Sequence, residues 1–323
     1  MSDLPLLLAD IGATNARFGL AVDGALNESR IFACADFESP ADAALAFLAD
    51  IPADARPRRG AFALAGPVLG DEVTMINRGW TFSLEETRKA LGLDRFVAVN
   101  DFTAVALAAP RLGRADVMTV GGGTAVAGAP VAVLGPGSGL GVSGLLPRPI
   151  DGQGKGGWVA LSGEGGHATM AACDDREAEV LAALRARFGH VSAERVLSGP
   201  GLSALYGALA EVDGEMLSEA PEAAEITAAG LAQSDPLAVE TIDLFCAMLG
   251  TVAGNLALTL GAAGGVLVAG GIVPRLGDRF ARTPFRARFE DKGRLRPYLE
   301  KIPTAVVTHP LPAFLGLTQA LED

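Results

Sequence analysis

Runs of hydrophobic residues separated by turn-forming residues organise the chain. The apolar runs predict buried strands over residues 4–9, 16–22, 60–65, 96–99, 131–134, 142–146 and 266–269. Helix-forming composition and helix-start signals predict helices over residues 42–48, 84–91, 103–108, 176–188, 202–209 and 313–321. This succession of strands and helices is typical of an α/β protein.

An uncharged segment, residues 244–274, is long enough to cross a bilayer. Small residues at 261–265 interrupt it, and basic anchors do not flank it. Asp235 and Pro236 form a helix start, and apolar residues then recur at helical spacing as far as Leu260. We therefore expect a buried helix followed by a buried strand, rather than a membrane span.

The segment Val97–Ala108 carries a carboxylate at the point where a strand gives way to a helix. Asn100 and Asp101 follow the apolar strand directly, and Pro110 ends the helix that begins near Thr103. Such a position lies at the carboxyl edge of a sheet, where α/β proteins bind ligands, and Asp101 could accept a proton from a substrate hydroxyl. The alternative is that Asp101 only caps the helix.

Two strand–turn–strand patterns with small residues in the turn suggest phosphate binding. In Asp10-Ile-Gly-Ala-Thr-Asn15, we expect Gly12 to be free to take a positive φ, Thr14 and Asn15 to bond phosphate oxygens, and Asp10 to face a magnesium ion through water. Gly135-Pro-Gly-Ser-Gly-Leu-Gly141 repeats the pattern later in the chain. A single hairpin of this kind could be an ordinary turn. The repetition instead suggests two related domains facing each other over one nucleotide.

The second turn also contains a competing motif. Gly139-Leu-Gly-Val-Ser-Gly144 matches the dinucleotide-binding spacing G-x-G-x-x-G. That fingerprint has to open a helix, whereas Pro147 and Pro149 follow here. We therefore expect the match to be accidental.

Three further places carry groups that could bind a polyol or a nucleotide. Glu164 and His167 stand three apart among glycines, and Glu194 lies in the first turn of a helix that Ser192 opens. Alternatively, Glu164 and His167 are solvated residues of a tight turn, and Glu194 is a favourable charge at the start of a helix. Gly270 and Gly271 end a short strand and would let a flat adenosine ring lie on the backbone.

Composition narrows the class of partner. A formal net charge of −12 argues against nucleic acid and against an anionic membrane, since either needs a basic face. Three widely spaced cysteines form no disulfide or zinc pattern, which fits a reducing cytosol. Residues 1–20 lack a basic segment before the apolar run, so we expect no signal peptide and a cytoplasmic protein.

The motifs together resemble the bacterial glucokinases of the actin/hexokinase ATPase superfamily. The resemblance covers residues 6 to 317, with the motifs in the family's order. It rests on Asp10–Asn15, Val99–Val105, Gly137–Gly141, Gly163–His167, His190–Gly201 and Gly270–Arg275, with Phe285–Gly293 as a further segment specific to this group. The zinc motif of the repressor–kinase sister family is absent from the sequence.

The resemblance implies a role for each of these places. Asp101 would be the general base for the 6-hydroxyl of D-glucose, giving glucose 6-phosphate and ADP at the first step of glycolysis. The remaining hydroxyls would be bound by Asn100, Glu164, His167 and Glu194. ATP would be held by Asp10, Ile11, Gly12, Ala13, Thr14, Gly137, Ser138, Gly270 and Gly271, with Asp10 reaching Mg²⁺ through water.

Two positions depart from the family's usual pattern. Ala13 replaces a common Gly and adds a methyl group beside the phosphates, and Ser138 replaces a common Thr while keeping the hydroxyl. Neither departure puts the reaction in doubt, but both could change nucleotide affinity.

The implied fold is a two-domain, ribonuclease H-like α/β structure with an interdomain cleft. We expect a small domain over residues 1–110, completed by a C-terminal helix at 309–323, and a large domain over 111–308. The expected partners are D-glucose and ATP, with a homodimer as the candidate assembly. The alternatives are a kinase for another hexose, a non-catalytic sugar sensor and an actin-like filament ATPase. The acids and the His at separate places favour a polyol pocket over a filament.

Overall fold

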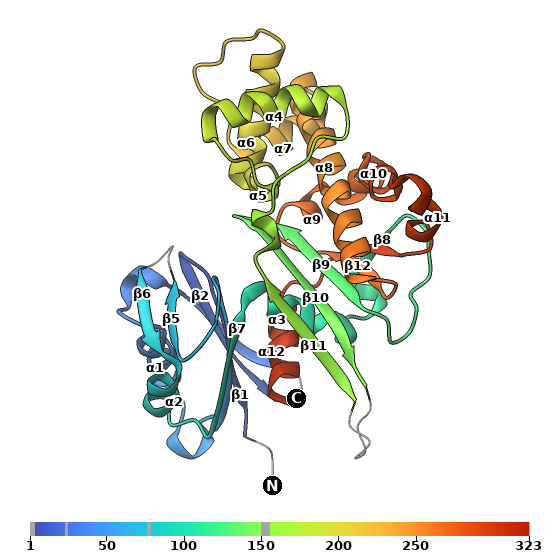
Figure 1. Cartoon of the computed structure of the whole chain (residues 1–323). Helices are drawn as coiled ribbons and strands as arrows, with labels where there is room; N and C mark the ends of the chain where they lie inside the picture. The colour runs from blue at the N-terminus through green and yellow to red at the C-terminus, as the bar shows by residue number, and fades with distance from the viewer. Residues whose placement is uncertain (1–3, 23–24, 76–78, 150–155, 323) are drawn as a thin grey trace. The chain divides into compact units, whose positions relative to one another are not determined.

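The computed structural model describes residues 4–22, 25–75, 79–149 and 156–322 (Figure 1). The chain forms two compact units. The first unit comprises Met1–Leu112, Arg148–Ser162 and His309–Asp323, and the second comprises Gly113–Pro147 and Gly163–Thr308. The predicted α/β class is confirmed, because strands and helices alternate through both units.

The first unit is built on a five-stranded sheet with the order β3-β2-β1-β4-β7. Its strands are β1 (Leu6–Ile11), β2 (Asn15–Val22), β3 (Ala25–Ala33), β4 (Arg59–Leu64) and β7 (Arg95–Asn100). β1 pairs antiparallel with β2 and parallel with β4, and β4 pairs parallel with β7. The carboxyl ends of the parallel strands β1, β4 and β7 therefore share one edge of the sheet.

Helices and a small hairpin complete this unit. Their bounds are α1 (Pro40–Leu48), β5 (Glu72–Met75), β6 (Trp80–Ser83), α2 (Leu84–Ala90), α3 (Asp101–Ala108) and α12 (Pro312–Glu322). The core of the sheet includes Phe18, Phe47 and Phe62, all fully buried, with the ring of Phe18 stacked on Phe47 and edge-on to Phe62.

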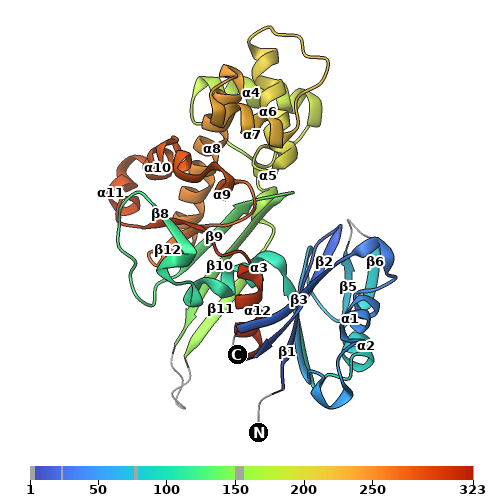
Figure 2. The same cartoon turned by 180° about the vertical axis from the view of Figure 1, so that it is seen from behind.

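Helices α3 and α12 lie side by side although they are far apart in the chain, as both cartoon views show (Figures 1 and 2). Gly316 makes this contact: a Cβ atom built there would lie 1.7 Å from the carbonyl oxygen of Ala104. The backbones therefore approach more closely than any larger residue permits. The expected tail helix over 313–321 is confirmed, and its function in the fold is to cover α3.

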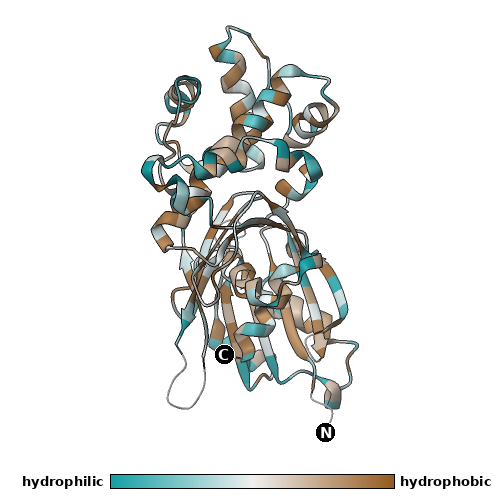
Figure 3. Ribbon diagram, turned by 90° about the vertical axis from the view of Figure 1, so that its right-hand side faces the viewer, coloured by the Kyte–Doolittle hydropathy of each residue, from teal (hydrophilic) through white to brown (hydrophobic). Residues whose placement is uncertain are grey.

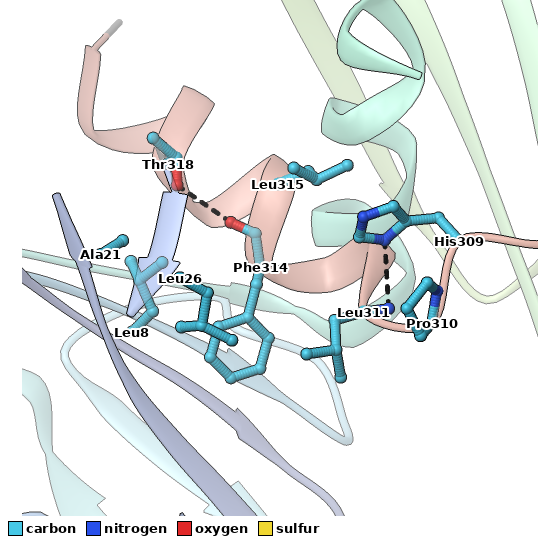
Figure 4. A pocket seen from close by; sticks show the side chains of 9 residues that line it. All are labelled: Leu8, Ala21, Leu26, His309, Pro310, Leu311, Phe314, Leu315 and Thr318. Carbon is cyan, nitrogen blue, oxygen red and sulfur yellow. Dashed lines mark hydrogen bonds between the residues drawn. The ribbon is translucent and has the colours of Figure 1, made fainter. Parts of the chain in front are cut away.

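A pocket of about 280 Å³ lies beside α12 in the first unit (Figure 4). Phe314 packs over Gly19 of β2, where a Cβ atom would lie 2.9 Å from its ring. His309 accepts a hydrogen bond from the backbone N–H of Leu311 at 3.1 Å and so fixes the start of the helix. The lining is mainly apolar and contains none of the predicted site residues.

A six-stranded sheet, most of whose strands belong to the second unit, repeats the strand order of the five-stranded sheet. It has the order β11-β10-β9-β12-β13-β8, with β9 parallel to β12 and β12 parallel to β13. The strands are β8 (Val117–Val120), β9 (Val131–Pro136), β10 (Leu140–Arg148), β11 (Gly157–Gly163), β12 (Gly265–Val268) and β13 (Thr304–Val307). β9 to β13 thus follow the order of β1, β2, β3, β4 and β7. The segment after Gly139 is strand β10 and not a helix, so the dinucleotide match is accidental, as expected.

The helices of the second unit surround α8 (Pro236–Leu260), whose bounds agree with the prediction. Ile242, Phe245 and Leu249 are buried in the core of this unit. Among the described residues this is the one helix long and apolar enough to cross a membrane, and 67% of its apolar window is buried. We therefore assign it as a core helix. In Figure 3, hydrophobic stretches coloured brown lie along the strands, and the helices carry both hydrophobic and hydrophilic residues.

The remaining helices of this unit are shorter. They are α4 (Asp175–Phe188), α5 (Ala193–Val196), α6 (Gly199–Val212), α7 (Ala223–Ala232), α9 (Val273–Leu276), α10 (Phe285–Glu290) and α11 (Arg296–Leu299). Leu197 and Ser198 separate α5 from α6, and α6 begins at Gly199, before the Leu202 at which the sequence predicted this helix. Ser198 is the N-cap of α6 and accepts from the N–H of Gly201 at 3.1 Å, because a Ser before Gly-Pro satisfies the first turn.

Candidate functional site

Asn100 and Asp101 lie where β7 ends and α3 begins, as predicted. The residue that caps α3 is Asn100, whereas the alternative interpretation gave this role to Asp101. Asn100 is the N-cap, and its Oδ1 accepts from the N–H groups of Phe102 at 2.9 Å and Thr103 at 3.1 Å. Its Nδ2 donates to the carbonyl oxygen of Gly66 at 3.3 Å. Asp101 is instead the first helical residue, with Oδ1 2.8 Å from the N–H of Phe102. The helix is therefore capped without Asp101.

The first phosphate-type turn is tighter than expected. Asp10 is still within β1, paired with Arg17, so only Gly12 to Thr14 form the turn. The N–H of Gly12 donates to the carbonyl oxygen of Asn15 at 3.0 Å and closes it. The expectation of a positive φ at Gly12 was wrong, because this bond closes the turn with φ outside the left-handed region.

Asp10 is the group in this turn that could serve a metal ion. Burial raises the pKa of its carboxyl, and the positive charge of Arg17 opposes that shift. Among the described residues, no three His, Cys, Asp or Glu side chains form a metal-binding group. A single desolvated carboxylate fits Mg²⁺, which keeps most of its waters and is bound by one or two carboxylates together with substrate phosphates.

The second phosphate-type turn, residues 137–139, is held from two helices of its own unit. The N–H of Gly199, at the start of α6, donates to the carbonyl oxygen of Gly137 at 2.8 Å. The N–H of Leu140 donates to Oε2 of Glu194, in α5, at 2.8 Å. Ser138 at the tip is exposed. The turn is thus fixed at both ends, while its tip is accessible.

Glu164, His167 and Glu194 come together in the second unit. His167 lies 4.0 Å from Glu164 (Nε2 to Oε2) and 3.8 Å from Glu194 (Nδ1 to Oε1). Two backbone bonds set this arrangement: the N–H of Ala193 donates to Ala168 at 2.8 Å, and that of Met170 donates to Val191 at 3.0 Å. The side chains of His167 and Glu164 are 60% and 59% exposed, so their polar atoms can reach a ligand.

The two glycines after β12 lie next to the second turn. Gly270 has φ +83°, and a Cβ atom there would lie 2.4 Å from the carbonyl oxygen of Pro136, at the end of β9. The N–H of Ile272 donates to the same oxygen at 3.3 Å. The predicted adenosine glycines and the predicted phosphate turn are therefore neighbours within one unit.

Two features of the site were not predicted from the sequence. The cap role of Asn100 was missed, although an Asn before a helix is a recognised signal for it. The bond from Leu140 to Glu194 joins residues 54 positions apart, and no local pattern indicates it.

The family model described as Glucokinase matches residues 7–323. The chain belongs to the glucokinase family. The glucokinase of Paramagnetospirillum magneticum is 51% identical over 320 residues, which cover 98% of each chain.

Other relatives are longer or known as structures. The bifunctional protein glk of Paraburkholderia xenovorans is 47% identical, and the chain spans about half its length (49%). A glucokinase structure from an Antarctic psychrotroph has a TM-score of 0.87 at 36% identity, covering 98% of each chain. A ROK-family glucokinase of Streptomyces griseus, described in complex with glucose and AMPPNP, has a TM-score of 0.64 at 20% identity and covers 98% of each chain. Together these confirm the expected family and its fold.

Proposed function

We propose that this chain transfers the γ-phosphoryl group of ATP to the 6-hydroxyl of D-glucose, forming glucose 6-phosphate and ADP. Membership of the glucokinase family supports this reaction. The observation that carries it is the meeting of Glu164, His167 and Glu194, which supplies acceptors and a donor for sugar hydroxyls in one accessible cluster.

Asp101 is the proposed general base. Its carboxylate stands at the end of a parallel strand and is not needed as the helix cap, since Asn100 performs that task. It can therefore accept the proton that the attacking 6-hydroxyl loses. Asn100, held by its bonds to α3 and to Gly66, is a rigid support for a further sugar contact.

Nucleotide contacts are proposed in each unit by itself. The proposed phosphate-contacting residues are Asp10, Ile11, Gly12, Ala13 and Thr14 in the first unit, and Gly137 and Ser138 in the second. Gly270 and Gly271 contact the adenosine. Mg²⁺, when bound with ATP, neutralises charge on the phosphates, and Asp10 would hold it through water.

The expected domains, 1–110 with 309–323 and 111–308, remain part of this proposal, as do cytoplasmic localisation and a homodimer. An ADP-release assay over a panel of hexoses tests the function. Glucose should give the highest kcat/KM, and a sugar lacking the 6-hydroxyl should give no product. Preference for another hexose would replace glucose as the substrate, and ATP hydrolysis indifferent to sugar would refute the kinase assignment.

A further inference from the structure

Glu194 contacts two different parts of the site with its two oxygens. Oε2 accepts from the N–H of Leu140 at 2.8 Å, and Oε1 lies 3.8 Å from Nδ1 of His167. Leu140 is buried, with 5% of its surface exposed, so losing this carboxylate as a partner would cost its N–H a hydrogen bond. One side chain therefore connects the proposed sugar cluster with the proposed phosphate turn.

The side chain of Glu194 passes directly over Gly139. A Cβ atom at Gly139 would lie 2.5 Å from Oε2 and 3.2 Å from Cδ of Glu194, and the three atoms nearest to it all belong to Glu194. The φ of Gly139 is outside the left-handed region, so its backbone conformation admits an L-residue. The need for glycine at this position comes from the side chain that crosses it.

The other end of the turn has a separate support. The carbonyl oxygen of Gly137 accepts from Gly199 of α6, and the N–H of Gly137 donates to the carbonyl oxygen of Gly139, both at 2.8 Å. Displacing Glu194 would therefore release the Leu140 end while leaving the Gly137 end attached. The turn would remain folded but lose the fixed direction of its N–H groups.

We propose that Glu194 is a positioning residue for the phosphate turn in addition to a sugar ligand, so that glucose and nucleotide binding are coupled through its carboxylate. This inference rests on the proposed function. A sugar bound to Glu194 orders the carboxylate, the ordered carboxylate holds Leu140, and the turn then presents its N–H groups to phosphate with less loss of entropy. The same coupling must act in the reverse direction, from nucleotide to sugar.

A double-mutant cycle tests the contact. The variants are Gly139→Ala, Glu194→Ala and the two combined, with Gly122→Ala, an exposed glycine of the same unit with no atom within 4 Å of its built Cβ, as the control. ADP affinity is measured by calorimetry with and without glucose, and thermal unfolding checks the fold. In the wild-type background, Gly139→Ala should weaken ADP binding in the presence of glucose about fivefold or more, within the usual range of coupling energies.

In the Glu194→Ala background, the same Gly139→Ala change should alter ADP affinity less than about twofold, because the clashing side chain is gone. Additive effects, or a neutral Gly139→Ala, would overturn the proposal. Glu194→Gln supplies the conservative variant: its amide oxygen can still accept from Leu140, so ADP affinity should stay near wild type while the KM for glucose rises. Loss of ADP affinity in Glu194→Gln equal to that in Glu194→Ala would also overturn it.

The calorimetry does not depend on turnover, so failure of the inference is distinguishable from failure of the proposed function. If the wild-type chain did not phosphorylate glucose, the proposed function would fail, while the cycle with ADP alone would still report whether Gly139 acts through Glu194.

Discussion

Replacing Asp101 by Asn removes a base while changing little else. The amide keeps the size of the carboxyl, and its oxygen can still accept from the N–H of Phe102, now 2.8 Å from Oδ1. The cap of α3 is supplied by Asn100 and is untouched. Asp101→Asn should therefore fold with wild-type thermal stability.

The expected loss is in the chemical step. General-base assistance contributes roughly 10² to 10⁴ in rate, which corresponds to about 2.7 to 5.4 kcal/mol at about 1.36 kcal/mol for each factor of ten. Phosphoryl transfer has a loose transition state in which the nucleophile has formed little new bond, so we expect a value near the lower end. The kcat of Asp101→Asn should fall about a hundredfold or more, with the dissociation constant for glucose nearly unchanged.

Stopped assays of glucose 6-phosphate give kcat, and calorimetry gives the glucose affinity. The matched control is Asn100→Ala, which removes the cap and should lower the free energy of unfolding by about 1 kcal/mol. If Asp101→Asn turned over within a few-fold of wild type, the general base would have to be another residue. If it unfolded like Asn100→Ala, its role would be structural.

Three further changes test other parts of the structure. Burial raises the pKa of Asp10 above 3.8, so the folded state binds this proton more tightly than the unfolded state does, and the carboxyl lowers the free energy of unfolding as the pH rises above 3.8. Asp10→Asn should therefore raise the melting temperature at pH 7, lose that gain below pH about 3.8, and weaken the binding of Mg·ATP. Arg288→Ala leaves the fully buried Glu177 carboxylate without its ion-pair partner and should cost about 3 kcal/mol or more in urea unfolding. Gly270→Ala places a Cβ atom 2.4 Å from the carbonyl oxygen of Pro136 and should raise the KM for ATP more than that for glucose; equal rises would contradict the adenosine assignment.

The sequence predicted helices and strands well where residues at their own ends mark the boundaries. Helix α8 was predicted with its observed bounds, because Asp235, Pro236 and Gly261 mark both ends and the apolar spacing fills the middle. The sequence predicted that this helix begins at Leu202, because Gly-Pro-Gly is typical of a turn, whereas the Ser198 cap makes these residues the first turn of α6. The hydrogen bond from the N–H of Gly201 to the side chain of Ser198 therefore sets the residue at which α6 begins.

The candidate site was predictable as a set of residues but not as an arrangement. Glu164 and His167 were paired by spacing, since three positions bring them together in a tight turn. Glu194 could be assigned to the same cluster only through family resemblance, because the backbone pairing of Ala168 with Ala193 is a tertiary contact. Because Glu194 also accepts a hydrogen bond from Leu140, Glu194→Ala should weaken nucleotide binding as well as glucose binding.

The close contact of α3 with α12 has a consequence for synthesis on the ribosome. Helix α3 ends at Ala108, and its partner begins only at Pro312. At about 5 to 20 residues per second, the roughly 200 residues between them take about 10 to 40 s to translate. During that interval the backbone surface at Ala104 that receives Gly316 is uncovered. The nascent first unit should therefore be a transient chaperone client, released when α12 emerges and packs against α3.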